Sequence, residues 1–264
     1  MPEIAFDNTK LVFKQEEFKA YMQEELSAGD FATFQNLYLK YDNENLLRLI
    51  FDEGNDAFNE MGVFTKDELL EALNEEEPKN KLKPYLNQFI TEYRETEDKG
   101  SAVVWEHRLI TLYYRYAIKS NNPFLRNWFN FEFMIFTVMA AINSRKHGLS
   151  TENQIVDIDD ELIQSIAKSS AKDFGLSLDY PIVQSILNIY DIDNILKREE
   201  ALDRLRWDWI DEQTTFEYFS LDVIMAMLLK LRIIDRWITA DPAIGKQLFK
   251  NLLDEIKLNS KKEI

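Results

Sequence analysis

The residues that most often carry enzyme chemistry are scarce in this sequence. The chain has 264 residues, no cysteine and two histidines, His107 and His147. The lack of cysteine excludes disulfides, thiol catalysis and cysteine-ligated metals, and it fits a reducing compartment. Neither histidine stands in an H-E-x-x-H motif, and no Glu-x-x-His pair occurs for a di-iron bundle. His147 beside Gly148 is typical of a cation at a helix C-terminus, and His107 is typical of a half-buried hydrogen-bonding side chain.

Two acidic runs have spacings that suggest proton or metal chemistry. Asp157-Ile158-Asp159-Asp160 resembles the D-x-D-D acid motif of some terpene cyclases, but it precedes a predicted helix start, where acids cap the helix. Asp191-Ile192-Asp193-Asn194 lacks the glycine that an EF-hand loop requires. The motifs G-x-S-x-G, G-x-G-x-x-G and G-x-x-x-x-G-K-[ST] are absent. We therefore predict no catalytic residue, no cofactor and no metal. An enzyme that uses carboxylates in a helical cavity is the functional hypothesis that the sequence favours least.

Charge limits the class of partner. The formal net charge is −16, and residues 1–100 carry 23 acids and 11 bases, a balance of −12. Residues 101–264 carry 24 acids and 20 bases, a balance of −4. Such a surface argues against nucleic acid and anionic lipid as primary partners and allows a basic protein partner. A plainly solvated acidic surface is the simpler interpretation of the same numbers.

The central stretch is NPFLRNWFNFEFMIFTVMAAINSRKHG, residues 122–148. Asn122 suits an N-cap, Pro123 a first turn and Gly148 a C-terminal stop, so the pattern predicts a helix over 123–147. Arg126 and Glu132 interrupt the apolar run, and a membrane span needs about 20 mostly apolar residues. We therefore predict a buried helix of an all-α protein without a direct membrane span.

Helical periodicity dominates the rest of the chain, and no strand-like alternation of any length occurs. Asp42 is predicted to cap a helix at 43–51, and Thr65 is predicted to form a capping box with Glu68. A further helix is predicted at 216–238, with Ser220 as an N-cap inside that range. The other predicted helices cover residues 14–26, 27–41, 86–97, 102–119, 160–174, 181–190, 192–210 and 242–258. The fold class is therefore all-α, a multi-helical bundle of antiparallel helical hairpins.

Composition and spacing also suggest how these helices are grouped. We predict an acidic N-terminal helical lobe at 1–99 and the main helical lobe or lobes at 100–264, which hold the central helix and C-terminal helices at 192–258. A Leu-Arg pair precedes a tryptophan both at 125–128 and at 205–209. Two short matches also arise by chance. A true repeat would mean that the fold duplicates a helical-hairpin lobe.

The sequence resembles a known family along most of its length. The resemblance is carried by NPFLRNWFNFEFMIFTVMAAINSRKHG, ALDRLRWDWIDEQTTFEYFSLDVIMAMLLKLRIIDRW and DPAIGKQLFKNLLDEIK, with FDNTKLVF and LYLKYDNENLLRLI in support. Together these segments are similar to the C-like central-stalk proteins of bacterial V-type (V/A-type) ATPases, in the version known only as a domain of unknown function. A Tyr-rich segment containing Leu-Pro opens that family, and this sequence has Met1–Ile4 in its place.

The resemblance implies a non-catalytic central-stalk subunit of a V-type ATPase or ATP synthase, of the type designated C in bacteria and d in eukaryotes. Such a protein is a funnel-like helical socket that receives the foot of the rotor axle and sits on the membrane rotor ring. It passes torque between ATP hydrolysis and ion or proton transport. The implied partners are thus the axle subunits and the ring, and the implied location is cytoplasmic, peripheral at the inner face of the membrane through the ATPase complex.

The family has no catalytic residues to transfer. We instead predict a polar-aromatic framework inside the lobes, made of Arg126, Trp128, Glu132, Arg206 and Trp209. The helix at 192–210 is expected to carry as its apolar residues Leu196, Ala201, Leu202, Leu205 and Trp209. The alternative function is a helical scaffold or adaptor protein with an acidic lobe that binds a basic protein partner.

Overall fold

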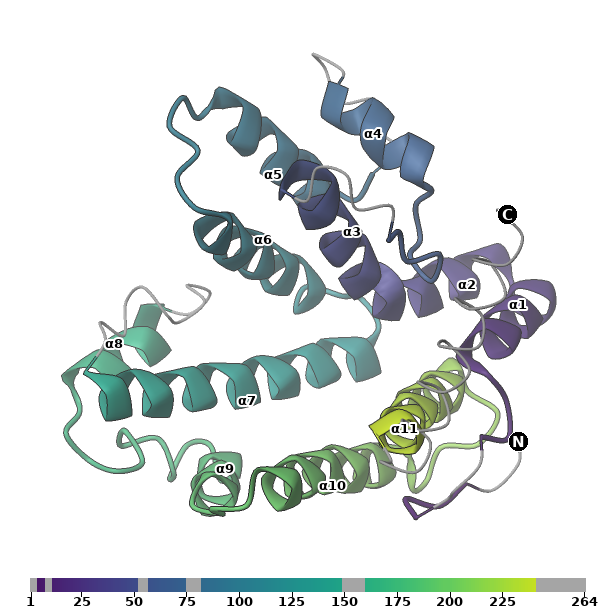
Figure 1. Cartoon of the computed structure of the whole chain (residues 1–264). Coiled ribbons are helices and arrows are strands. Elements are labelled where there is room, and N and C mark those ends of the chain that lie inside the picture. The colour runs from purple at the N-terminus through teal and green to yellow at the C-terminus, as the bar shows by residue number, and fades with distance from the viewer. Residues whose placement is uncertain (1–3, 8–10, 52–56, 75–81, 149–159, 241–264) are drawn as a thin grey trace, which may run out of the picture. The chain divides into compact units, whose positions relative to one another are not determined.

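The computed structural model describes residues 4–7, 11–51, 57–74, 82–148 and 160–240. Within these ranges the chain is helical, without a strand, as predicted (Figure 1). No helix in the described part of the chain is both long and apolar enough to cross a membrane. The helices are α1 (Gln15–Glu25), α2 (Ala28–Phe34), the 3₁₀ turn η1 (Gln35–Tyr38), α3 (Leu39–Phe51), α4 (Lys66–Asn74), α5 (Pro84–Glu95), α6 (Ala102–Ala117), α7 (Pro123–His147), α8 (Asp160–Lys168), α9 (Ile182–Tyr190), α10 (Ile195–Thr214) and α11 (Leu221–Ala240).

The chain divides into two compact units. One consists of residues 1–28 and 200–264, and the other of residues 29–199. The boundary predicted near residue 99 lies inside the second unit, where α5 and α6 pack as an antiparallel hairpin. A loop of polar residues is therefore no sign of a domain boundary here, because the helices on its two sides bury their apolar faces against each other.

The unit formed by residues 29–199 is organised around the α5–α6 hairpin and α7. The helix α6 packs against α5, α3 and α7, and α7 packs in turn against α9 (Figure 1). The shared core contains Leu86, Phe89, Leu109 and Leu125, all fully buried. Tyr190 on α9 donates a hydrogen bond to Asn143 on α7 at 2.9 Å, which supplements the apolar packing of that pair.

The helix α7 has the ends that its sequence predicts. The Asn122 side chain accepts a hydrogen bond from the Leu125 N–H at 2.8 Å, and Pro123 occupies the first turn. Gly148 ends the helix at φ 64°, in the left-handed region that favours glycine. His147 lies exposed in the last turn, where a cation is favourable next to the helix C-terminus.

The unit formed by residues 1–28 and 200–264 contains α1, most of α10 and α11. The helix α1 packs against α11, and the Gln15 amide donates to Asp235 at 2.6 Å. Phe6 meets the Trp207 ring edge to face at 5.5 Å, and the Arg204 guanidinium lies 4.2 Å from the centre of the Phe6 ring. A segment near the N-terminus thus covers α10 with aromatic contacts.

Several predicted boundaries differ from the observed ones. Asp42 lies inside α3 and not before it, because η1 carries the chain from α2 into α3 without a break. The helix predicted to reach residue 174 ends at Lys168 as α8, while α11 begins after Ser220, whose hydroxyl accepts from the Val223 N–H at 3.4 Å. The helix predicted at 242–258 lies outside the described residues.

Candidate functional site

Carboxylates lie at the centre of the polar clusters described below, and the first cluster is centred on Asp42. Its side chain is fully buried and accepts hydrogen bonds from the Val63 and Phe64 backbone N–H groups at 2.9 and 3.0 Å. A β-carbon at Gly62 would lie 2.6 Å from the Asp42 carboxylate, so only glycine fits beside it. Charge-assisted bonds from backbone N–H groups are strong, and here they fix a turn 21 residues away against α3.

Two asparagines on α3 extend this cluster. Asn45 exchanges two hydrogen bonds with the Asn59 backbone, at 2.8 and 2.9 Å, and Asn43 accepts from the Tyr85 hydroxyl at 2.7 Å. Burial raises the pKa of Tyr85 well above its usual value and lowers the pKa of Lys83. Tyr85 is therefore held as a neutral donor, which suits a structural hydrogen bond and not acid–base catalysis near neutral pH.

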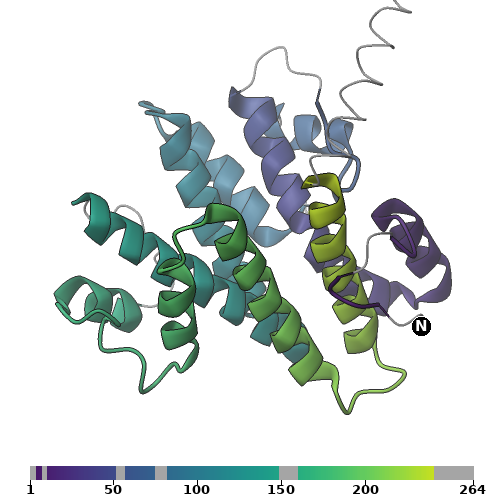
Figure 2. The same cartoon turned by 60° about the horizontal axis from the view of Figure 1, so that its bottom comes forward.

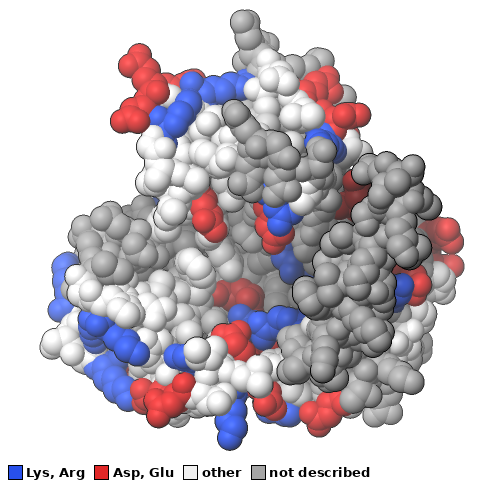
Figure 3. All heavy atoms as spheres, in the orientation of Figure 1, with Lys and Arg blue, Asp and Glu red and all other residues white. Residues whose placement is uncertain are grey.

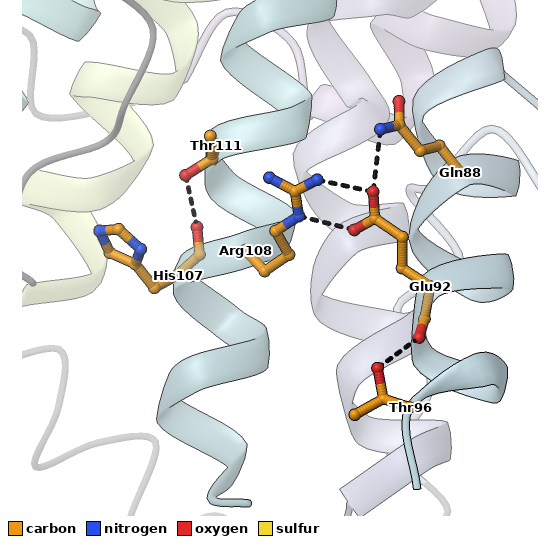
Figure 4. Close-up of polar contacts among 6 residues, drawn as sticks. All are labelled: Gln88, Glu92, Thr96, His107, Arg108 and Thr111. Carbon is orange, nitrogen blue, oxygen red and sulfur yellow. Dashed lines mark hydrogen bonds and ion pairs between the residues drawn. The ribbon is translucent and has the colours of Figure 1, made fainter. Parts of the chain in front are cut away.

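A second cluster joins α5 to α6 (Figure 4). Glu92 binds Arg108 through two bonds of 2.6 Å each, and the Gln88 amide donates to the same carboxylate at 2.9 Å. The bond from Arg108 is the main reason that the pKa of Glu92 lies below its ordinary value. His107 points away from this pair in Figure 4. The cluster thus joins α5 to α6 through a paired carboxylate and guanidinium group.

The third cluster links α10 to α11 through the buried Asp203. Its carboxylate accepts from the Trp237 indole at 2.8 Å and from Arg206 at 3.1 Å, and it also pairs with Arg236. An aspartate with an indole and two guanidinium groups around it has its acceptor capacity well satisfied. This arrangement ties together two helices whose paired residues lie 33 positions apart in the sequence.

The five predicted framework residues have different surroundings. Arg206 lies in the Asp203 cluster, and Trp128 is buried beside Phe131, with ring centres 5.7 Å apart. Arg126 is exposed and donates to the Ser120 carbonyl at 3.3 Å. Glu132 and Trp209 are half-buried. Arg126, Trp128 and Glu132 belong to the unit of residues 29–199, and Arg206 and Trp209 belong to the other unit.

The apolar residues predicted along α10 do not all lie on its buried side. Leu196 is 63% exposed, whereas Trp207 and Ile210 are buried together with Leu202. The sequence pattern also gave no indication of Asp203, since an acid on an apolar face looks like a break in the periodicity. The role of Asp203 is indicated by the indole and guanidinium donors on α11. These donors can be recognised as its partners only when the pairing of α10 with α11 is known.

Charge and cavities give no stronger catalytic candidate. On the face shown in Figure 3, acidic and basic side chains are interspersed among uncharged ones. A cavity of about 310 Å³ lies within residues 29–199, with Leu39, Ala117 and Phe129 as apolar lining and Asn36, Ser120 and Asn122 among the polar lining. No group of three or more potential metal-ligating side chains occurs in the described ranges. The polar clusters described above stabilise the packing of the helices.

The chain belongs to a protein family. Residues 1–260 match the family model described as Protein of unknown function (DUF2764). No curated protein and no solved structure matches the chain.

Proposed function

We propose that this chain is a non-catalytic central-stalk subunit of a V-type ATPase or ATP synthase, which couples the rotor axle to the membrane ion-translocating ring. The proposal starts from the resemblance of segments 122–148, 201–237 and 241–257 to the C-like central-stalk proteins. A protein of this kind transmits force and binds other proteins, so its helices must stay rigidly joined and its polar groups need no catalytic arrangement.

The observation that carries the proposal is the pair of buried aspartates, one in each compact unit. Asp42 fixes the turn at 62–64 to α3, and Asp203 fixes α10 to α11. Removing one partner from such a buried network costs about 3–5 kcal/mol, so each network holds its elements in one arrangement. Helices that are locked in this way can pass a load without changing their packing.

The test is binding of the purified chain to the rotor axle subunits of the same source's V-type ATPase. Isothermal titration calorimetry and co-purification should give a one-to-one complex that persists at moderate salt. A complex that disappears fully at about 0.5 M salt would indicate non-specific attraction to the acidic surface. The absence of any complex with the axle or with the ring would reject the proposed role.

The alternative is a helical adaptor for a basic protein outside any ATPase. It shares the acidic balance of −12 in residues 1–100 but predicts no affinity for the axle subunits. Variants in which acidic residues on the axle-binding face are replaced by basic ones test whether the contact with the axle is electrostatic or purely apolar. Binding should weaken more at low salt than at high salt, and equal weakening at both would contradict an electrostatic contact.

A further inference from the structure

The loop between α10 and α11 carries three exposed aromatic side chains in four residues. Phe216, Tyr218 and Phe219 are 89%, 75% and 106% exposed. The loop closes the α10–α11 hairpin, as Figure 2 shows. Exposed aromatic rings that cluster in this way are costly in water and are typical of binding surfaces. We call residues 215–220 the aromatic loop.

Nothing in the described part of the chain engages these rings. Their side chains make no hydrogen bond, ion pair or ring contact there, while the loop backbone is held by a bond from the Glu217 N–H to the Thr214 carbonyl at 3.1 Å. Phe219 has φ 58°, a left-handed conformation that is rare for a bulky residue. A strained conformation that exposes a ring to solvent indicates that the ring serves to bind another molecule and not to stabilise the fold.

The charges around the aromatic loop select the kind of partner. The segment 207–229 contains no lysine or arginine, and its acids besides Asp211 and Asp222 are Asp208, Glu212 and Glu217. The next cation, Lys230, is turned inward: it pairs with Asp211 and lies 4.8 Å from the centre of the Trp207 ring. An acidic rim is repelled by anionic lipid headgroups and attracted by lysine and arginine on a protein.

We propose that the aromatic loop is the anchor by which this chain binds its protein partner. The rings of Phe216, Tyr218 and Phe219 enter an apolar groove, and basic side chains at the edge of that groove pair with the acids beside the loop. The identity of the partner rests on the proposed function, which makes it the rotor axle. Aromatic residues dominate the energetics of such interfaces because they bury large areas with little loss of entropy.

The test compares loop variants of the full chain for binding to the purified axle subunits by calorimetry. Phe216→Ser and Tyr218→Ser should each weaken the Kd by about tenfold or more. Phe219→Gly is the sharpest variant, because glycine accepts the left-handed conformation and removes only the ring. It should keep or raise the thermal unfolding midpoint while it weakens the Kd, which separates anchoring from a structural role.

The matched control is Leu178→Ser, a side chain that is 96% exposed in the other compact unit. It should bind the axle as the unaltered chain does. If the unaltered chain binds and the loop variants bind equally well, the anchor is disproved while the proposed function stands. If the unaltered chain binds neither axle nor ring, both fail.

Two other binding partners of the aromatic loop, lipid and a second copy of the chain, can be tested by direct measurements. Sedimentation of the chain with phosphatidylglycerol-containing vesicles that is lost in Phe219→Gly would assign the loop to lipid and overturn the proposal. A dimer of the chain that dissociates in Phe219→Gly, seen by light scattering, would assign the loop to a second copy and also overturn it.

Discussion

Two phenylalanines of this protein adopt nearly the same unfavourable backbone conformation with opposite surroundings. Phe174 has φ 57° and Phe219 has φ 58°. The Phe174 ring is buried, 3% exposed, and the Arg145 guanidinium lies 4.1 Å from its centre. The Phe219 ring is fully exposed on the aromatic loop. The cost of the left-handed conformation is offset inside the fold at Phe174, whereas at Phe219 no contact within the described residues offsets it.

The hydrogen bonds of the two loops extend the contrast. Arg145 donates to the Ala171 and Ser169 carbonyls at 2.6 and 2.8 Å, and Asp173 accepts from the Gly175 N–H at 3.0 Å. The two arginine bonds hold the turn at 169–175 to α7 from one side chain. The Glu217 bond of the aromatic loop, by contrast, stays within its own hairpin. The turn at 169–175 is thus held by contacts with the rest of its unit, whereas the side chains of the aromatic loop remain available for binding.

The largest expected difference follows from truncating each ring. Phe174→Ala should lower the free energy of unfolding by about 3–4 kcal/mol, because it empties a buried position and removes the cation–π contact without relieving the backbone. Phe219→Ala should change it by no more than about 0.5 kcal/mol, as expected for an exposed position. Urea unfolding followed by circular dichroism measures both, and equal losses would mean that Phe219 is also part of the core.

Most of the fold could be predicted from local sequence patterns. The ends of α7 and the capping box at the start of α4 were predicted correctly, and in the capping box the Thr65 N–H donates to Glu68 at 2.9 Å. These features depend on residues three or four positions apart, whose spacing is fixed by the helix itself. Helical periodicity likewise predicted the all-α class.

The polar clusters could not be predicted, because their partners are distant in sequence. Asp42 was expected to cap the next helix, yet its hydrogen bonds reach 21 residues ahead to Val63. Asp203 and Trp237 are 34 residues apart, and only the packing of α10 with α11 brings them together. The conformations of Phe174 and Phe219 also lack a local signal, since phenylalanine rarely adopts positive φ. The clusters that helical periodicity did not predict are thus formed by contacts between residues distant in the sequence.

A smaller effect is expected from the arginine that holds the Phe174 turn. Arg145→Met keeps most of the apolar stem and removes the guanidinium, so it should cost about 1–2 kcal/mol through two lost hydrogen bonds and the cation–π contact. Hydrogen exchange measured by mass spectrometry should show faster exchange in the peptide that spans 169–176. The peptide that spans 215–220 is the internal control, and faster exchange there as well would indicate a global loss of stability.

The smallest expected effect concerns pH at the same turn. The bond from the Gly175 N–H, supported by Ser177, holds the pKa of Asp173 below its ordinary value. A carboxyl whose pKa is lower in the folded state stabilises the fold above its unfolded pKa of about 3.9, and the contribution is lost as the pH falls through the lower folded pKa. Asp173→Asn keeps an acceptor for Gly175 but cannot titrate. The thermal midpoint of the unaltered chain should therefore exceed that of Asp173→Asn slightly at pH 6, and the difference should shrink below about pH 4. A difference that stays constant from pH 6 to pH 3 would show that the charge of Asp173 does not stabilise the turn.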